Sequence, residues 1–176
     1  MSAFISGGCK NGKSYYAQRI AKANGAPLYY VATMIPHDEE DQARIRRHRD
    51  ERAGWGFETL ECGKHILTCL ERADCSGSFL LDSVTALLSN EMFTRDGMDP
   101  DAPARLAGEL VEFVRRAPNS VLVSDYIYSD ALLYDEWTEA YRRGLAHIDR
   151  ALAAACDDVI EVVHGITIVH KGRLPL

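Results

Sequence analysis

Apolar and polar positions along this chain follow two patterns that predict a layered α/β fold. Short, nearly continuous apolar runs bounded by Gly, Pro, Asp or Asn are typical of strands covered on both faces. Between several of these runs, apolar residues recur every three or four positions, as on the buried side of a helix. The longest such pattern steps from Trp137 to Ala155. The predicted strands are 4–6, 28–33, 57–60, 79–82, 121–125, 159–163 and 166–169.

The order of these elements predicts the architecture. Strands that alternate with helices pair in parallel through right-handed crossovers, so we expect a mostly parallel sheet with helices on both faces. At the C-terminal end, two apolar runs are separated only by His164 and Gly165, which predicts an antiparallel hairpin. Residues 95–103 are rich in Asp, Gly and Pro and predict a loop, with Asp101 or Ala102 near the start of the next helix.

Composition and charge narrow the class of protein. The chain has 176 residues, of which 47% are hydrophobic and 26% charged, and these values are ordinary for a globular domain. We therefore treat residues 1–176 as a single P-loop nucleotide-binding domain, on the motif described next. The longest apolar runs are far shorter than the ~20 residues of a membrane helix, and the N-terminus lacks a signal peptide's basic region. A net charge of −6 argues against non-specific nucleic-acid binding. We expect a cytoplasmic protein with no membrane span and no nucleic-acid partner.

A phosphate-binding pattern, G-x-x-x-x-G-K-[ST], follows the first predicted strand. Its glycines let backbone N–H groups turn toward phosphate oxygens, and the following helix directs its positive N-terminus at them. Lys13 would reach the β- and γ-phosphates, and the Ser14 hydroxyl would bind Mg²⁺. Because a strand precedes the motif and an amphipathic helix follows it, we expect a nucleoside triphosphate site on a RecA-like P-loop fold. The matching residues are Gly7, Gly8, Cys9, Lys10, Asn11, Gly12, Lys13 and Ser14.

Two further apolar strands end in a carboxylate that could support the magnesium ion or position a nucleophile. Asp82 ends one of them and Asp125 the other. Ligands of open α/β sheets bind at the carboxyl ends of strands, so both acids lie at the expected edge. Either could instead cap the helix or turn that follows it. Asp82 is the stronger candidate, because a helix start follows it directly.

Residues 37–52 form a segment that is acidic at its start and basic at its end, a polarity that suits a helix. Only Ala43 and Ile45 are apolar, so the helix is either a solvated connection between strands or a cover over the phosphate site. In the second case its arginines would bind phosphate. His48 lies among them, where positive neighbours favour its neutral, nucleophilic form. It could attack phosphorus or only donate a hydrogen bond. The arginines are Arg44, Arg47, Arg49 and Arg52.

The order of these features resembles the bifunctional adenosylcobinamide kinase/adenosylcobinamide-phosphate guanylyltransferase family of cobalamin biosynthesis. The resemblance covers nearly the whole chain. It includes the phosphate loop, Tyr30-Val31-Ala32-Thr33, Ala43-Arg44-Ile45, His48-Arg49-Asp50, Glu61, the acid at Asp82 and the terminal hairpin.

This resemblance implies two reactions. Adenosylcobinamide would be phosphorylated with ATP or GTP, and GMP would then pass from GTP to that phosphate through a covalent histidine–GMP intermediate at His48. Lys13 and Asp82 would act in catalysis, with Mg²⁺ held by Ser14 and Asp82, and the protein would be a homotrimer. Nucleotide contacts beyond the phosphate loop are implied at Ala32, Thr33, Met34, Arg49, Asp50, Glu51, Arg52, Glu61 and Asp82.

The sequence departs from the family pattern in two places that we associate with the acceptor substrate. Where the family usually carries Asn-Glu-Val-Gly followed by a Gly-x-x-Pro stretch, this chain has Ser124-Asp125-Tyr126-Ile127-Tyr128-Ser129-Asp130. In the long helix, Ile148-Asp149 replaces an Asn-Gln pair. Two alternatives therefore stay open. One is a divergent relative with a different acceptor or only one half-reaction, and the other is a GTP-binding module without catalysis.

Overall fold

The computed structural model describes residues 1–36, 38–95 and 97–173, with the side chains of Arg44, His48 and Glu51 outside the description. Seven strands form one sheet in the order β3-β2-β4-β7-β1-β8-β9. Neighbouring strands are parallel except for the antiparallel pair β8–β9. The strands are β1 (Ala3–Gly7), β2 (Leu28–Ala32), β3 (Phe57–Glu61), β4 (Ser78–Asp82), β7 (Ser120–Asp125), β8 (Asp158–Val163) and β9 (Ile166–Lys171).

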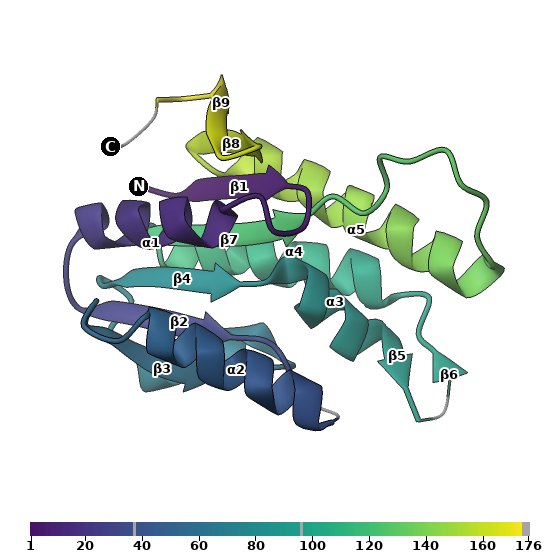
Figure 1. Ribbon diagram of the computed structural model, residues 1–176, viewed down its shortest axis with the longest axis horizontal. Coiled ribbons are helices and arrows are strands. Elements are labelled where there is room, and N and C mark those ends of the chain that lie inside the picture. The colour runs from purple at the N-terminus through teal and green to yellow at the C-terminus, as the bar shows by residue number, and fades with distance from the viewer. Residues whose placement is uncertain (37, 96, 174–176) are drawn as a thin grey trace.

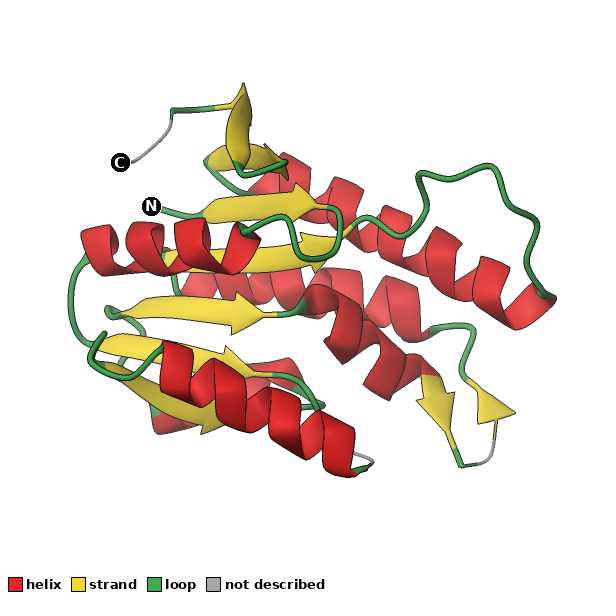
Figure 2. Cartoon of the chain, viewed as in Figure 1, coloured by secondary structure: helices red, strands yellow, loops and turns green. Residues whose placement is uncertain are grey.

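Helices cover both faces of this sheet, which gives the three layers seen in Figure 1 and Figure 2. Helices α1 (Lys13–Asn24) and α2 (Glu39–Glu51) lie on one face. Helices α3 (Val84–Met92), α4 (Ala102–Arg116) and α5 (Glu136–Ala155) lie on the other. The remaining elements are a 3-10 helix, η1 (Ile66–Arg72), and a small hairpin of β5 (Phe93–Thr94) and β6 (Gly97–Met98). Within the described residues, no helix is long and apolar enough to cross a membrane.

An apolar core lies on each side of the sheet, which explains the nearly continuous apolar runs in its central strands. On one side, Ile20 of α1 packs among strand residues such as Ile5. On the other side, Phe113 of α4 meets Phe79 of β4 edge to face, with ring centroids 5.6 Å apart. Such an aromatic pair adds about 1 kcal/mol beyond the area that it buries. Burial on both faces fixes the strands and therefore the position of their ends.

The predicted strands are all present close to their expected ends, and the antiparallel hairpin with its turn at His164 and Gly165 is confirmed. The β5–β6 hairpin differs from the expected loop at 95–103. Phe93 at its start stacks on Trp137 of α5, with centroids 6.3 Å apart and planes inclined by 13°. This contact joins positions far apart in sequence, so local composition gave no indication of it.

Three neighbouring strands bring their carboxyl ends to one edge of the sheet. In the register of the sheet, Gly7 of β1 is opposite Asp125 of β7, and Asp82 of β4 is opposite Val123 of β7. The phosphate loop follows β1 directly. The loop and both candidate acids therefore meet at the same edge, where ligands of such sheets bind.

Candidate active site

The loop between β1 and α1 depends on glycine at two positions. A Cβ atom at residue 7 would lie 2.5 Å from the carbonyl oxygen of Val162 in the neighbouring strand β8, so only glycine fits at this position. Gly12 has a φ of 87°, in the left-handed region that favours glycine. Asn11 anchors the loop from within, because its side-chain amide donates to the Val162 carbonyl at 3.2 Å. These residues hold the loop in a turned conformation.

Lys13 extends from the first turn of α1 back to the strand ends. Its side chain is only 6% exposed, and its ammonium group donates to Asp125 Oδ1 and to the carbonyl of Gly8, both at 2.6 Å. A buried ammonium group needs such partners, since its desolvation is costly. An incoming phosphate group would compete with Asp125 for this charge. Asp125, the weaker candidate from sequence, therefore belongs to the site together with Asp82.

A second polar pair links the start of α1 to the end of β4 and consists of Ser14 and Asp82. The Ser14 hydroxyl donates to Asp82 Oδ2 at 3.3 Å. Hydroxyl and carboxylate oxygens are the ligands that Mg²⁺ accepts, usually with water and substrate phosphates completing its shell. Among the described residues, no cluster of three or more His, Cys, Asp or Glu side chains could hold a metal ion. The pair fits a magnesium–nucleotide site.

These side chains lie in a cleft of 1360 Å³, which exceeds the ~300–1000 Å³ of an ordinary small-molecule pocket. The phosphate loop, Asp82 and Asp125 form one side. Helix α2 forms the other, where Arg46, Arg47 and Arg49 contribute positive charge. None of the described side chains of α2 is buried. Each interpretation of this segment therefore describes one aspect of the structure: α2 is a solvated helix, and it also borders the phosphate site.

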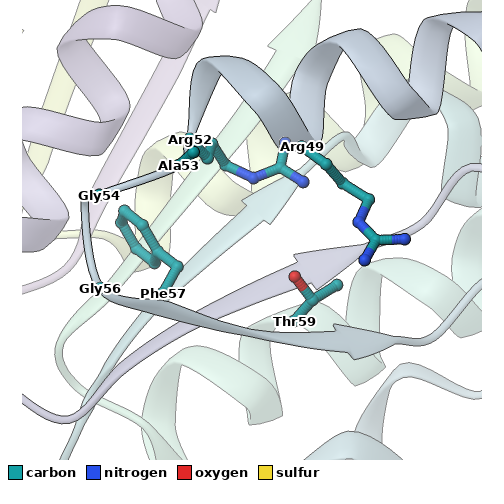
Figure 3. Close-up of a pocket in the computed structure, with 7 residues that line it drawn as sticks. All are labelled: Arg49, Arg52, Ala53, Gly54, Gly56, Phe57 and Thr59. Atoms are coloured by element: carbon teal, nitrogen blue, oxygen red, sulfur yellow. The ribbon is translucent and has the colours of Figure 1, made fainter.

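Arg49 and Arg52, two of the predicted phosphate ligands, differ in their surroundings. Both line a smaller hollow of 420 Å³ at the end of α2, together with Thr59 of β3 (Figure 3). Arg49 is exposed, whereas Arg52 is 8% exposed and its guanidinium carbon lies 3.4 Å from the centre of the Tyr30 ring. The charge of Arg52 is therefore engaged with an aromatic ring in this structure.

The other predicted nucleotide contacts fall into two groups. Ala32, Met34 and Glu61 line the cleft. Thr33 is fully buried instead; its hydroxyl donates to the carbonyl of Ser83 at 2.8 Å and accepts the Ser83 N–H at 2.7 Å. The Thr33 side chain thus fixes the turn that follows β4. In the phosphate loop, Cys9, Lys10, Asn11, Gly12, Lys13 and Ser14 line the cleft.

Three further predicted site residues, at the end of α2, are not among the residues described as lining the cleft. Asp50 is exposed and is absent from the residues that line the described part of the cleft. The side chains of His48 and Glu51 lie outside the described residues. The helix backbone places His48 between Arg47 and Arg49, both of which border the cleft.

A segment that we call the strap, residues 126–135, leads from Asp125 to α5. Arg142 of α5 holds it: this side chain is 7% exposed and donates to the carbonyls of Ile127 at 3.2 Å and Leu132 at 3.4 Å. It also forms an ion pair with Asp130 at 2.9 Å. Sequence reasoning missed Arg142, although an arginine beside the apolar stripe of a predicted helix was the available signal.

The strap is also tied to the phosphate loop and to the middle of α5. The N–H of Tyr126 donates to the carbonyl of Gly7 at 3.3 Å. The Tyr128 hydroxyl donates to Asp149 Oδ2 at 2.8 Å. Burial raises the pKa of Asp149 to about 6, although the hydroxyl groups of Tyr128 and Ser124 act in the opposite direction. The two places where the sequence departs from the family pattern are thus in direct contact.

Comparisons with known proteins agree with this geometry. The sequence model of the family described as cobinamide kinase / cobinamide phosphate guanyltransferase matches residues 3–169. The chain belongs to this family. Among its relatives, the bifunctional adenosylcobalamin biosynthesis protein CobU of Salmonella typhimurium is 30% identical, with 97% of this chain aligned to all of that protein. The protein CobP of Pseudomonas aeruginosa, with the same description, is 31% identical over 98% of this chain and 99% of its own length.

A solved structure shows the fold independently. The RadB recombinase superposes with a TM-score of 0.51 over 99% of this chain and 82% of its own length, at 17% sequence identity. At that identity the likeness concerns the fold alone. The predicted RecA-like P-loop architecture is confirmed.

Proposed function

We propose that this cleft performs both reactions of its family, as an adenosylcobinamide kinase and an adenosylcobinamide-phosphate guanylyltransferase of adenosylcobalamin biosynthesis. The family match over residues 3–169 carries the proposal. The gathering of Lys13, Ser14, Asp82 and Asp125 opposite the arginines of α2 supports it, because phosphoryl transfer requires concentrated positive charge and metal-binding oxygens.

In the first reaction, the hydroxyl oxygen of adenosylcobinamide attacks the γ-phosphorus of ATP or GTP and releases its proton to solvent. The bond from that phosphorus to the β–γ bridging oxygen breaks, and a nucleoside diphosphate leaves. Lys13 and the N–H groups of the phosphate loop stabilise the charge on the transferred group. Ser14 and Asp82 would hold Mg²⁺, which when bound neutralises charge on the phosphate oxygens.

In the second reaction, a ring nitrogen of His48 attacks the α-phosphorus of GTP, and pyrophosphate leaves. The phosphate oxygen of the phosphorylated acceptor then attacks the same phosphorus, which releases His48 and completes the transfer of GMP. A covalent intermediate divides one difficult displacement into two easier ones. Arg46, Arg47 and Arg49 border the cleft beside this position and supply positive charge for both displacements.

The same proposal extends to assembly and location. A homotrimer would shield part of α2, whose described side chains are all at least partly exposed in the single chain. We place the protein in the cytoplasm, where its nucleotide substrates are made, and treat residues 1–176 as one nucleotide-binding unit. Light scattering should give three times the 19.6 kDa mass of the chain, and the mass of a single chain would contradict the trimer.

A two-step product analysis tests the function. The protein is incubated with adenosylcobinamide, ATP and Mg²⁺, then with GTP, and the corrinoids are analysed by mass spectrometry. We expect addition of one phosphate and then of one GMP. Lys13→Met should block the first step, and His48→Ala only the second. GTP binding without any product would favour a binding module, and a His48 adduct without a corrinoid product would favour a different acceptor.

A further inference from the structure

Tyr30 of β2 connects the two helices that flank the cleft. Its side chain is 5% exposed and packs in the core on the α1 side of the sheet. The guanidinium carbon of Arg52 lies 3.4 Å from the centre of its ring. Its hydroxyl donates to Asp82 Oδ2 at 3.1 Å, and the Ser14 hydroxyl donates to the same oxygen at 3.3 Å. A continuous chain of contacts therefore runs from Arg52, directly after α2, to Ser14 in the first turn of α1.

Three features restrict the movement of the side chains in this chain of contacts. A cation over an aromatic face is held more strongly when it is removed from water, and Arg52 is 8% exposed. A tyrosine side chain has only two rotatable bonds, so a shift at its face also moves its hydroxyl. Phe57 contacts the Tyr30 ring edge to face, with centroids 6.4 Å apart and planes inclined by 77°, and limits its rotation.

The hydrogen bond from Tyr30 selects which carboxylate oxygen faces the phosphate loop. A hydrogen bond to a charged carboxylate is both strong and directional. Because the hydroxyl groups of Tyr30 and Ser14 both donate to Oδ2, the Asp82 carboxylate is held by two elements at once. One of those elements is connected to the end of α2 through Arg52.

We propose that Tyr30 is a positioning residue: it orients Asp82 for the magnesium–nucleotide complex and couples that orientation to the position of α2 through Arg52. This inference rests on the proposed function for the identity of the ligand, a nucleoside triphosphate with Mg²⁺. It assigns Tyr30 no contact with the reacting atoms. In this proposal, the position of α2 and the orientation of Asp82 depend on one another.

Binding of a non-hydrolysable GTP analogue to Tyr30→Phe, with Mg²⁺ and with EDTA, tests the first part. We expect the affinity with Mg²⁺ to fall about three- to tenfold, the effect of one lost hydrogen bond, and the affinity in EDTA to be unchanged. Tyr29→Phe is the matched control, because the Tyr29 hydroxyl accepts the Asp74 N–H at 3.1 Å, away from the cleft. An unchanged affinity ratio, or an equal change in both variants, would overturn the proposal.

A double-mutant cycle with Arg52→Met tests the coupling. The measured quantity is the ratio of the affinities with Mg²⁺ and with EDTA. Any direct contact of Arg52 with the nucleotide contributes to both affinities and therefore cancels in this ratio. We expect Arg52→Met to lower this ratio in the parent protein but not in the Tyr30→Phe background. An equal loss in both backgrounds would overturn the coupling, since the two residues would then act independently.

These measurements separate the positioning role from the proposed function. Both experiments measure binding only. If the parent protein binds the magnesium–nucleotide complex but transfers no phosphate, the proposed function is refuted. The affinity ratio then still decides the role of Tyr30. Transfer that is intact in Tyr30→Phe, with an unchanged magnesium dependence, refutes the role of Tyr30 alone.

Discussion

The phosphate loop and the strap begin at adjacent strand ends but are held in place by different means. The loop is shaped by near neighbours in sequence: Gly12 takes the left-handed conformation, and Lys13 reaches back to the carbonyl of Gly8. The strap is held from a distance, because Arg142 of α5 binds its backbone at Ile127 and Leu132. The first kind of order is visible as a motif, and the second exists only in the folded chain.

This difference changes the meaning of the departures from the family pattern. The residues after Asp125 and the acid at Asp149 lie apart in sequence, yet Tyr128 and Asp149 share a hydrogen bond of 2.8 Å. Two departures that looked independent are therefore one structural unit. The strap is held to α5 by a buried arginine and a buried carboxylate, and we expect it to contribute to the binding of the acceptor.

The largest expected effect is on the phosphate-loop side. Lys13→Met removes the ammonium group that would stabilise the transferred phosphoryl group, so the rate of phosphoryl transfer should fall about 10²–10³-fold. Initial rates of corrinoid phosphorylation measure it. Lys22→Met is the control, because Lys22 lies on the exposed side of the same helix. Equal rates for the two variants would remove Lys13 from the mechanism.

A change on the strap side should have a different signature. Arg142→Met removes a buried charge with several partners, so the free energy of unfolding should fall by about 1–3 kcal/mol. The KM for the corrinoid should rise while the affinity for nucleotide stays constant, because the strap does not supply the phosphate contacts. Arg143→Met, at an exposed neighbouring position, is the control. A variant with an unchanged corrinoid KM would show that the strap is no part of the acceptor site.

Asp149 gives the strap a dependence on pH. Its pKa is about 6 in the folded chain against an ordinary value of 3.8, so between about pH 4 and 6 the native state binds more protons than the unfolded state. The free energy of unfolding therefore decreases as pH rises through that window. Asp149→Asn retains an acceptor for Tyr128 and avoids this loss, so it should stabilise the protein by about 1–3 kcal/mol at pH 7.5. Near pH 4 the gain should vanish; an equal gain at both pH values would contradict this account.

The smallest effect concerns the cysteines of the cleft. Cys9 is exposed in the phosphate loop, whereas Cys62 is only 5% exposed. A hydrogen bond with Cys69 lowers the pKa of the Cys62 thiol, but its burial keeps reagents away. Because access limits alkylation, iodoacetamide should modify Cys9 first. GTP should slow that modification several-fold, as judged by peptide mass mapping. Modification of Cys9 at the same rate with saturating GTP would place the nucleotide elsewhere.

The features that could be predicted from the sequence differ in the same way from those that only the structure revealed. The parallel order, the terminal hairpin and the loop from Gly7 to Ser14 followed from periodicity and a local motif, because their causes are short-range. Asp125 was found as a candidate but ranked below Asp82, since the bond to Lys13 depends on strand order. Arg142 was missed, and Tyr30 was noted only as part of the family resemblance, because the partners of both residues come from other elements of the fold.

In the proposed function, one cleft carries both phosphoryl transfer by the loop and guanylyl transfer by α2. Intact-protein mass spectrometry after incubation with GTP and Mg²⁺ tests it most directly. His48→Ala is compared with His147→Ala, which removes an exposed histidine of α5. The account predicts a mass increase of one GMP in the parent and in His147→Ala, and none in His48→Ala. An adduct that persists in His48→Ala, or the absence of any adduct while GTP still binds, would contradict it.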